Sequence, residues 1–205
     1  MGVFGGKHVM KPVVYYHGPW VLQDSEEDGG EQVWRIFNMD VFTGIYTRRS
    51  VRDFTNVPVE NEKVQEILTA GSWAPSGLNN QPWRFVVVRS SEKRGELARL
   101  TKYSRVLEQV PLAIAVFTDR SAMYSDTKDY QAIGACLQNM LLAAHALGLG
   151  TVWLGEILKN AAAVRMSLDL PEELELMAVL AVGYPARTDQ TSKRKELREL
   201  LLKEV

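Results

Sequence analysis

The stretch from residue 131 to 147 constrains the fold most, because as a helix it is apolar on almost every face. Its apolar positions are Ile133, Cys136, Leu137, Met140, Leu141, Ala144 and Leu147. A helix of this kind is buried in a core or in an interface between chains. Gly148-Leu149-Gly150 ends the helix, and a strand is expected over Thr151–Leu154.

Apolar periodicity and β-branched runs predict further elements on both sides of that helix. Strands are expected over 84–88, 112–117 and 177–182, and helices over about 60–71, 91–100, 157–168 and 195–203. The pattern predicts one mixed α/β (α+β) domain over residues 39–205, with a central sheet flanked by helices. Residues 1–38 lack this periodicity and carry an acidic, glycine-containing turn at 24–30. They are more typical of a flexible or mis-assigned extension than of an arm with a role of its own.

Composition excludes several classes of protein. The chain has 205 residues, with 24 Lys and Arg against 25 Asp and Glu. This near-balance gives no reason to expect nucleic acid or an anionic membrane as a partner. No apolar stretch is long enough to cross a bilayer and no signal peptide is visible, so a cytoplasmic protein is expected. The single cysteine, Cys136, excludes an intramolecular disulfide and a cysteine-based zinc or iron–sulfur site.

Catalysis by side chains has little support in the sequence. His8 and His17 fall in the extension, and His145 lies on the apolar helix without acidic residues at metal-ligand spacing. We interpret His145 as a core or interface histidine. No nucleophile elbow, metalloprotease motif, P-loop or glycine-rich dinucleotide fingerprint is present. We therefore predict neither a metal nor a catalytic side chain, and expect a cofactor to carry any reaction.

A basic segment, Arg48-Arg49-Ser50-Val51-Arg52, is the first candidate binding element. Arginine offers forked donors that suit phosphate oxygens, and a hydroxyl adds another donor. In an extended chain Arg48, Ser50 and Arg52 point to one side, since side chains alternate with period two. Alone, such a segment is more typical of a solvated basic turn.

A polar loop, Ala74–Trp83, is the second candidate element. Its two prolines, one glycine and several amide and hydroxyl side chains predict a rigid connection between helix and strand. Asn and Gln carry both donors and acceptors, which suits the edge of a flavin pyrimidine ring. Further on, Gly155 ends a strand, where a glycine lets the backbone approach a flat ligand. Each element is weak by itself, and the loop could be only a structural turn.

In order and content these segments resemble the FMN-dependent nitroreductase family. Its members typically read R-R-S-x-R-x-F and then A-P-S-x-x-N-x-Q-P-W-x-F, as Arg48–Phe54 and Ala74–Phe85 do here. The resemblance continues through the apolar helix, the strand Gly148–Gly155 and Val182–Pro185, and covers about residues 43–203. It implies a nitroreductase-like fold with a mixed or antiparallel sheet flanked by helices.

The resemblance also implies roles for particular residues. Arg48, Arg49 and Ser50 are expected at the FMN phosphate and ribityl chain, with Arg52 nearer the N1/O2 edge of the ring. The expected ring contacts are Pro75, Ser76, Asn79, Gln81, Leu154 and Gly155, the last two through the backbone near N5. The family's C-terminal K-x-R motif corresponds to Ser192-Lys193-Arg194, where Arg194 fits the arginine. Ser192 stands where the lysine is expected, so Lys193 or Lys195 takes its place.

For function, the resemblance implies a homodimer with FMN in the interface and a ping-pong reaction. NADH or NADPH supplies hydride to flavin N5, and a small acceptor such as a nitroaromatic or quinone then takes electrons. The segment 119–128 is short, and Met123 and Tyr124 are expected to line the substrate pocket. Two alternatives stay open: a specialised flavin enzyme that dehalogenates, fragments flavin or oxidises azolines, and a flavin-binding module without catalysis.

Overall fold

An antiparallel sheet forms the centre of the part of the chain that the structure, a computed structural model, describes, which is residues 39–205. Its strands are β1 (Trp83–Val88), β2 (Leu112–Asp119), β4 (Leu174–Gly183) and β3 (Gly150–Leu154), in that spatial order. Neighbouring strands are antiparallel, with Phe85 opposite Val116 and Val152 opposite Ala181. The predicted fold class is confirmed. The predicted extension, residues 1–38, lies outside the described residues.

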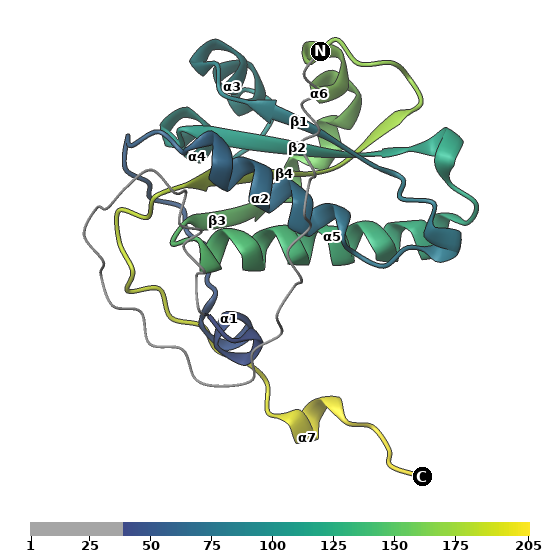
Figure 1. Cartoon of the computed structure of the whole chain (residues 1–205). Coiled ribbons are helices and arrows are strands. Elements are labelled where there is room, and N and C mark those ends of the chain that lie inside the picture. Colours follow the sequence, from purple (N-terminus) through teal and green to yellow (C-terminus); the bar gives the residue numbers. More distant parts are fainter. Residues whose placement is uncertain (1–38) are drawn as a thin grey trace, which may run out of the picture. The chain divides into compact units, whose positions relative to one another are not determined.

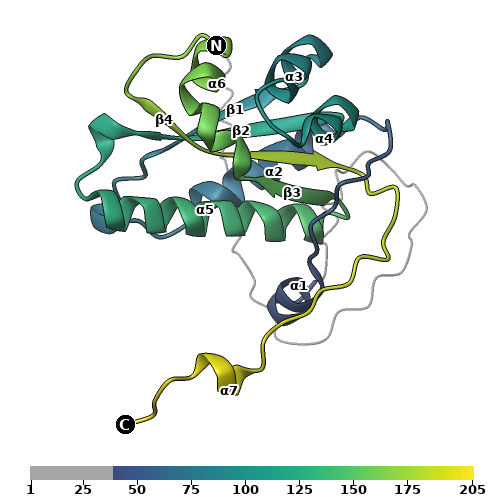
Figure 2. The same ribbon diagram turned by 180° about the vertical axis from the view of Figure 1, so that it is seen from behind.

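Helices cover both faces of the sheet (Figures 1 and 2). On one face lie α2 (Asn61–Ser72) and α5 (Asp126–Ala146). On the other face lie α3 (Ser91–Ala98), α4 (Ser104–Gln109) and α6 (Ala161–Ser167). The result is a three-layer arrangement with a hydrophobic core on each side of the sheet.

The apolar run in β2 follows from these two layers. Ile114 and Val116 belong to the core under α2 and α5, whereas Ala115 and Phe117 belong to the core under α3, α4 and α6. Successive side chains of a strand point to opposite faces, so a strand covered on both sides needs apolar residues at every position.

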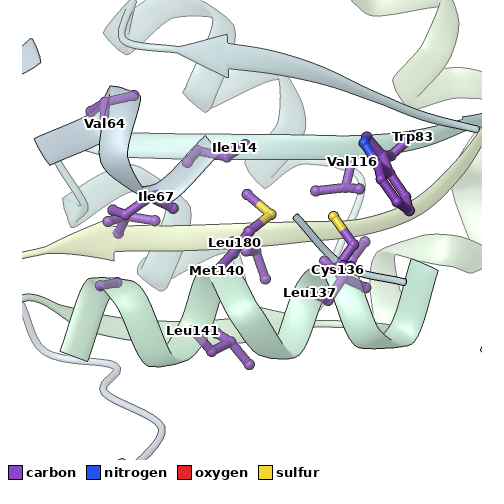
Figure 3. Close-up of a cluster of buried hydrophobic side chains, with 14 of the residues drawn as sticks. Val64, Ile67, Trp83, Ile114, Val116, Cys136, Leu137, Met140, Leu141 and Leu180 are labelled. Atoms are coloured by element: carbon purple, nitrogen blue, oxygen red, sulfur yellow. The ribbon is translucent and has the colours of Figure 1, made fainter. Parts of the chain in front are cut away.

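The helix α5 is buried against the sheet through Cys136, Leu137 and Met140 (Figure 3). In Figure 3 these side chains meet Leu180 of β4, and Ile67 of α2 lies in the same cluster. The sequence prediction of a buried helix is therefore correct, although the helix begins at Asp126, earlier than its apolar stretch.

Some elements differ from the prediction because they are short or exposed. α1 (Val41–Thr47) and α4 were not predicted, since one or two turns give little periodicity. The expected helix 157–168 is divided into a 3₁₀ turn, η3 (Glu156–Asn160), and α6. The last helix, α7 (Leu197–Leu200), is shorter than 195–203, and its residues are exposed. It extends away from the sheet in Figure 1, so no packing supports a longer helix.

Candidate functional site

The basic segment runs from the end of α1 along the first residues of β3. Ser50 forms an isolated parallel bridge with Thr151, and the Val51 N–H donates to the Thr151 carbonyl at 2.9 Å. Gly150 makes this approach possible, because a Cβ at that position would lie 2.8 Å from the Val51 side chain. The sheet edge thereby holds Arg48 and Arg49 beside the end of α5.

A pocket of about 330 Å³ lies at this junction. The basic segment, the end of α5, the start of β3 and the segment after β4 all contribute to it. Its lining residues are Thr47, Arg48, Arg49, Val51, His145, Gly148, Leu149, Gly150, Thr151, Pro185, Thr188 and Gln190. The arginines and His145 are its ionisable residues, so every formal charge that the lining carries is positive.

The charge of this pocket is not compensated within residues 39–205. None of Arg48, Arg49, Arg52 and Arg194 forms an ion pair with a described carboxylate. Burial lowers the pKa of Arg48, and the nearby charges of Arg194 and Arg49 lower it further. The structure thus brings Arg194 of the C-terminal segment to the arginines of the first motif. Partly buried arginines such as Arg48 and Arg49, without carboxylate partners among the described residues, are suited to bind an anion, and a phosphate fits their forked donors.

The two adjacent arginines are not equivalent. Arg49 donates through Nη1 to the carbonyls of Tyr46 and Arg48, at 2.7 and 2.9 Å, and so holds the end of α1. Its buried Nε has no hydrogen-bond partner among the described residues. The Arg48 guanidinium, in contrast, donates no hydrogen bond to a described residue, so its donors are free for a ligand.

The polar loop after α2 is strained and firmly anchored. Leu78, Asn79 and Gln81 have φ values of 54°, 55° and 46°, in the left-handed region that side chains other than Asn and Asp rarely adopt. Such residues cost about 1–3 kcal/mol each and persist only where the surroundings hold them. Here Asn80 donates to the Asp129 carboxylate at 2.7 Å and to the Ala122 carbonyl at 3.0 Å.

Asp129 is the anchor that the sequence interpretation missed. It is fully buried in the first turns of α5 and accepts the backbone N–H groups of Tyr124 and Ser125, each at 2.9 Å. Burial opposes its ionised form, but hydrogen bonds from Ser125 and Asn80 are strong enough to lower its pKa. The signal available in the sequence was an acidic residue in the first turns of a helix that follows a serine.

Tyr124 lies against the polar loop. An added Cβ at Gly77 would come 1.8 Å from the Tyr124 hydroxyl, so a larger residue there would require the Tyr124 side chain to move. The Tyr124 ring is 43% exposed, and the Lys128 ammonium lies 5.3 Å from its centre. Its neighbour Met123 is half-buried. The structure therefore places Tyr124 at the edge of the polar loop, with part of its side chain exposed to solvent.

The end of β3 is held from outside the pocket. Leu154 is buried, whereas Gly155 is exposed beside the partly exposed Trp153. The next residue, Glu156, accepts the Thr101 hydroxyl at 2.7 Å and the Lys102 N–H at 3.0 Å. Its hydrogen bond to Lys159 is the largest cause that lowers its pKa to about 2. Glu156 thus fixes the backbone that follows Gly155.

Comparison with known proteins identifies the family. The nitroreductase family model matches residues 45–104 and 95–184. The chain belongs to the nitroreductase family.

Three relatives of this nitroreductase-family chain show how close the similarity is. A crystal structure of an FMN complex from Desulfovibrio desulfuricans superposes with a TM-score of 0.78 at 48% identity, covering 82% of this chain and 98% of that one. A Methanothermobacter thermautotrophicus protein named for NADH dehydrogenase and NAD(P)H nitroreductase activity is 34% identical, covering 77% of this chain and 83% of its own. A Vibrio harveyi NADPH-flavin oxidoreductase is 33% identical, covering 73% of this chain and 68% of its own length.

The two family motifs do not meet within one chain. The polar loop is attached at Asp129 near the start of α5. The pocket lined by Arg48, Arg49 and His145, which we call the cation pocket, lies at the other end, since His145 is in the last turn of α5. These positions are sixteen residues apart, which corresponds to about 24 Å along a helix. Arg48, Arg49, Ser50 and Arg194 therefore gather at one end of α5, and Ser76, Asn79 and Gln81 at the other.

Exposed apolar side chains flank both ends of α5. Near the pocket, α1 exposes Val41, Phe42, Ile45 and Tyr46, and Trp73 and Leu78 beside the polar loop are 83% and 85% exposed. Each of these two groups of exposed apolar side chains is available for contact with another protein surface.

Two classes of site have no support within residues 39–205. No group of His, Cys, Asp and Glu side chains there is placed to hold a metal ion. No helix of this part is both long and apolar enough to cross a membrane.

Proposed function

We propose that this protein is an FMN-dependent oxidoreductase that oxidises NADH or NADPH and reduces a small acceptor such as a nitroaromatic or a quinone. FMN, when bound, would supply the redox chemistry between the nicotinamide donor and the acceptor. The reaction belongs in the cytoplasm, where both nicotinamide donors are available. The observation that carries the proposal is the cation pocket, whose arginines form no ion pair with a described carboxylate and can therefore bind an anion.

The residues of the pocket hold the phosphate end of FMN in this proposal. Arg48 is the principal ligand because its donors are free, and Arg194 reaches the same anion from the C-terminal segment. Ser50 adds a hydroxyl, Arg49 adds charge, and Lys193 takes the place of the family's missing lysine.

The remaining family residues hold the ring. Arg52 places a positive charge toward its N1/O2 edge and stabilises negative charge there. Gly150 and Gly155 bound β3 and are about 17 Å apart in an extended strand. With the phosphate in the pocket, the backbone of Leu154 and Gly155 at the other end of β3 would contact the ring near N5.

We infer that the working enzyme is a homodimer. The loop with Pro75, Ser76, Asn79 and Gln81 lies at the far end of α5 from the pocket of its own chain, so a second copy must supply it. Asp129 binds both the polar loop and the segment with Met123 and Tyr124, so these two residues lie beside the loop. They would line the part of the pocket in which the electron acceptor binds. The exposed apolar residues of α1, together with Trp73 and Leu78, provide the contact surface.

Subunit complementation tests this assignment. Arg48→Ala damages the pocket, and a double variant, Asn79→Ala with Gln81→Ala, damages the loop. Co-refolding the two gives mixed dimers in which one site combines an intact pocket with an intact loop, so FMN binding returns to about half of the sites in those dimers. A mixture of Arg48→Ala with Arg194→Ala is the matched control and restores nothing, since both changes affect the pocket. If the first mixture also restores nothing, the shared site is wrong.

The redox activity is tested by stopped flow under anaerobic conditions. Mixing the FMN-loaded protein with NADH or NADPH should bleach the flavin absorbance, and a nitroaromatic or quinone should then restore it. A protein that binds FMN but is bleached by neither nucleotide would be a flavin-binding module without this activity.

A further inference from the structure

His145 is part of the cation pocket, although its sequence context suggested an ordinary core or interface histidine. It lies in the last turn of α5, is half-buried, and lines the pocket together with Arg48 and Arg49. Its Nε2 lies 2.8 Å from the Thr47 hydroxyl at the end of α1. The ring is thus held beside the arginines by a specific contact.

That contact determines which ring nitrogen carries hydrogen. The Thr47 hydroxyl donates its single proton to the Thr43 carbonyl at 2.6 Å. It can therefore only accept from His145, so Nε2 carries a hydrogen in both the neutral and the charged ring. The site that remains for an additional proton is Nδ1, which bonds to no described residue.

The surroundings of His145 disfavour its charged form. Burial is the largest cause that lowers its pKa, followed by the positive charges of Arg48 and Arg49. The other lining residues, from α1, β3, the turn before it and the segment after β4, carry no ionisable group. Arg194 adds positive charge beside Arg48, and no described carboxylate contributes to the shift.

We propose that His145 takes up a proton at Nδ1 from solvent when a phosphate monoester enters the pocket, and so becomes an additional cation of the binding site. The inference rests on the proposed FMN function for the identity of that phosphate. A dianion beside Arg48 and Arg49 offsets the positive potential that disfavours the imidazolium, and so raises the pKa of His145. Binding of FMN is then linked to proton uptake, and its affinity rises as the pH falls through neutrality.

The direct test follows the imidazole itself by NMR. His8→Gln and His17→Gln leave His145 as the single histidine, since the chain has three. A pH titration of its ¹³C-labelled ring should show a pKa below 6.5 in the apoprotein and a raised pKa with FMN. Riboflavin, which lacks the phosphate, should leave the pKa unchanged. An unchanged or lowered pKa with FMN, or an equal rise with riboflavin, contradicts the proposal.

The affinity test uses His145→Gln, whose amide can still donate to Thr47 but cannot be protonated. Below about pH 6 the variant should bind FMN about tenfold more weakly than the wild type, and above about pH 8 the two should agree. The phosphate of free FMN also titrates near pH 6, and this titration is the same in the two binding measurements. Parallel curves for the two proteins would show that His145 takes up no proton.

Inorganic phosphate separates the two proposals. If FMN binds to neither protein, the flavin function fails. A rise in the pKa of His145 with inorganic phosphate alone would then still establish the proton-linked anion site, and no rise would reject it as well.

Discussion

Asp129 offers the sharpest test of how the polar loop is held, because one buried carboxylate anchors two segments. Its Oδ1 accepts the Asn80 amide at 2.7 Å, and its Oδ2 accepts the backbone N–H groups of Tyr124 and Ser125 at 2.9 Å. Asp129→Ala removes all three acceptor contacts and leaves buried donors without partners. Asp129→Asn can keep the two backbone contacts, but its amide then faces the amide of Asn80, donor against donor.

The magnitudes follow from these contacts. A hydrogen bond to a charged group is worth about 1.5–3 kcal/mol, so Asp129→Asn should lower the free energy of unfolding by about that amount. The three contacts of the alanine variant are not additive, and we expect a loss of about 3–5 kcal/mol. Asp126→Ala is the matched control, since Asp126 is exposed in the same first turn. It should cost less than about 1 kcal/mol.

The pH dependence gives an independent check. The pKa of Asp129 is lowered in the folded protein, so its contribution is fully present above about pH 5 and is lost as the pH falls through the folded pKa. The stability difference between wild type and Asp129→Asn should therefore shrink below about pH 4.

Guanidinium unfolding of the apoprotein, followed by tryptophan fluorescence at fixed protein concentration, measures both effects. An Asp129→Ala variant within about 1 kcal/mol of the wild type, or a difference that does not change with pH, would refute the anchoring role.

Three further predictions concern other parts of the site. Glu156→Gln should lower the thermal midpoint at neutral pH, and this deficit should disappear as the pH falls toward 2, because the folded pKa of Glu156 is about 2. Gly77→Ala should lower the free energy of unfolding by about 1–3 kcal/mol in the wild type, and by clearly less in a protein that already carries Tyr124→Ala. A double-mutant cycle of denaturation measures this coupling. Trp73→Ser should weaken the dimer by about 1.5–3 kcal/mol in sedimentation equilibrium; an unchanged dimer constant would place the interface elsewhere.

Local chemistry made much of the fold predictable from the sequence. Apolar runs predicted all four strands of the described sheet, most clearly β2, which is covered on both faces and buried at nearly every position. The apolar helix is correctly placed for the same reason. α1 and α7 are different, since they are short, exposed helices whose ends are set by capping rather than by packing. Periodicity over so few turns did not reveal α1, and it predicted α7 as a longer helix than the structure has.

The site was less predictable, because its geometry depends on long-range contacts. The residue types of the basic segment indicated phosphate, but only the fold shows Arg194 beside Arg48 and His145 within the same pocket. His145 looked like a core residue because its helix is apolar on nearly every side. Asp129 was missed because an acidic residue at a helix start usually faces solvent and interacts with the helix dipole.

The length of α5 is the physical basis of the proposal that two chains share this site. The helix is buried against the sheet along most of its length, so the pocket at its end and the loop at its start cannot approach one another without disrupting the core. A distance of about 24 Å is thereby maintained as rigidly as the core itself. Two copies that exchange these ends can form two equivalent sites, each with the pocket of one chain and the loop of the other. Binding of FMN should then stabilise the dimer, and dilution of the apoprotein should weaken both dimerisation and flavin affinity together.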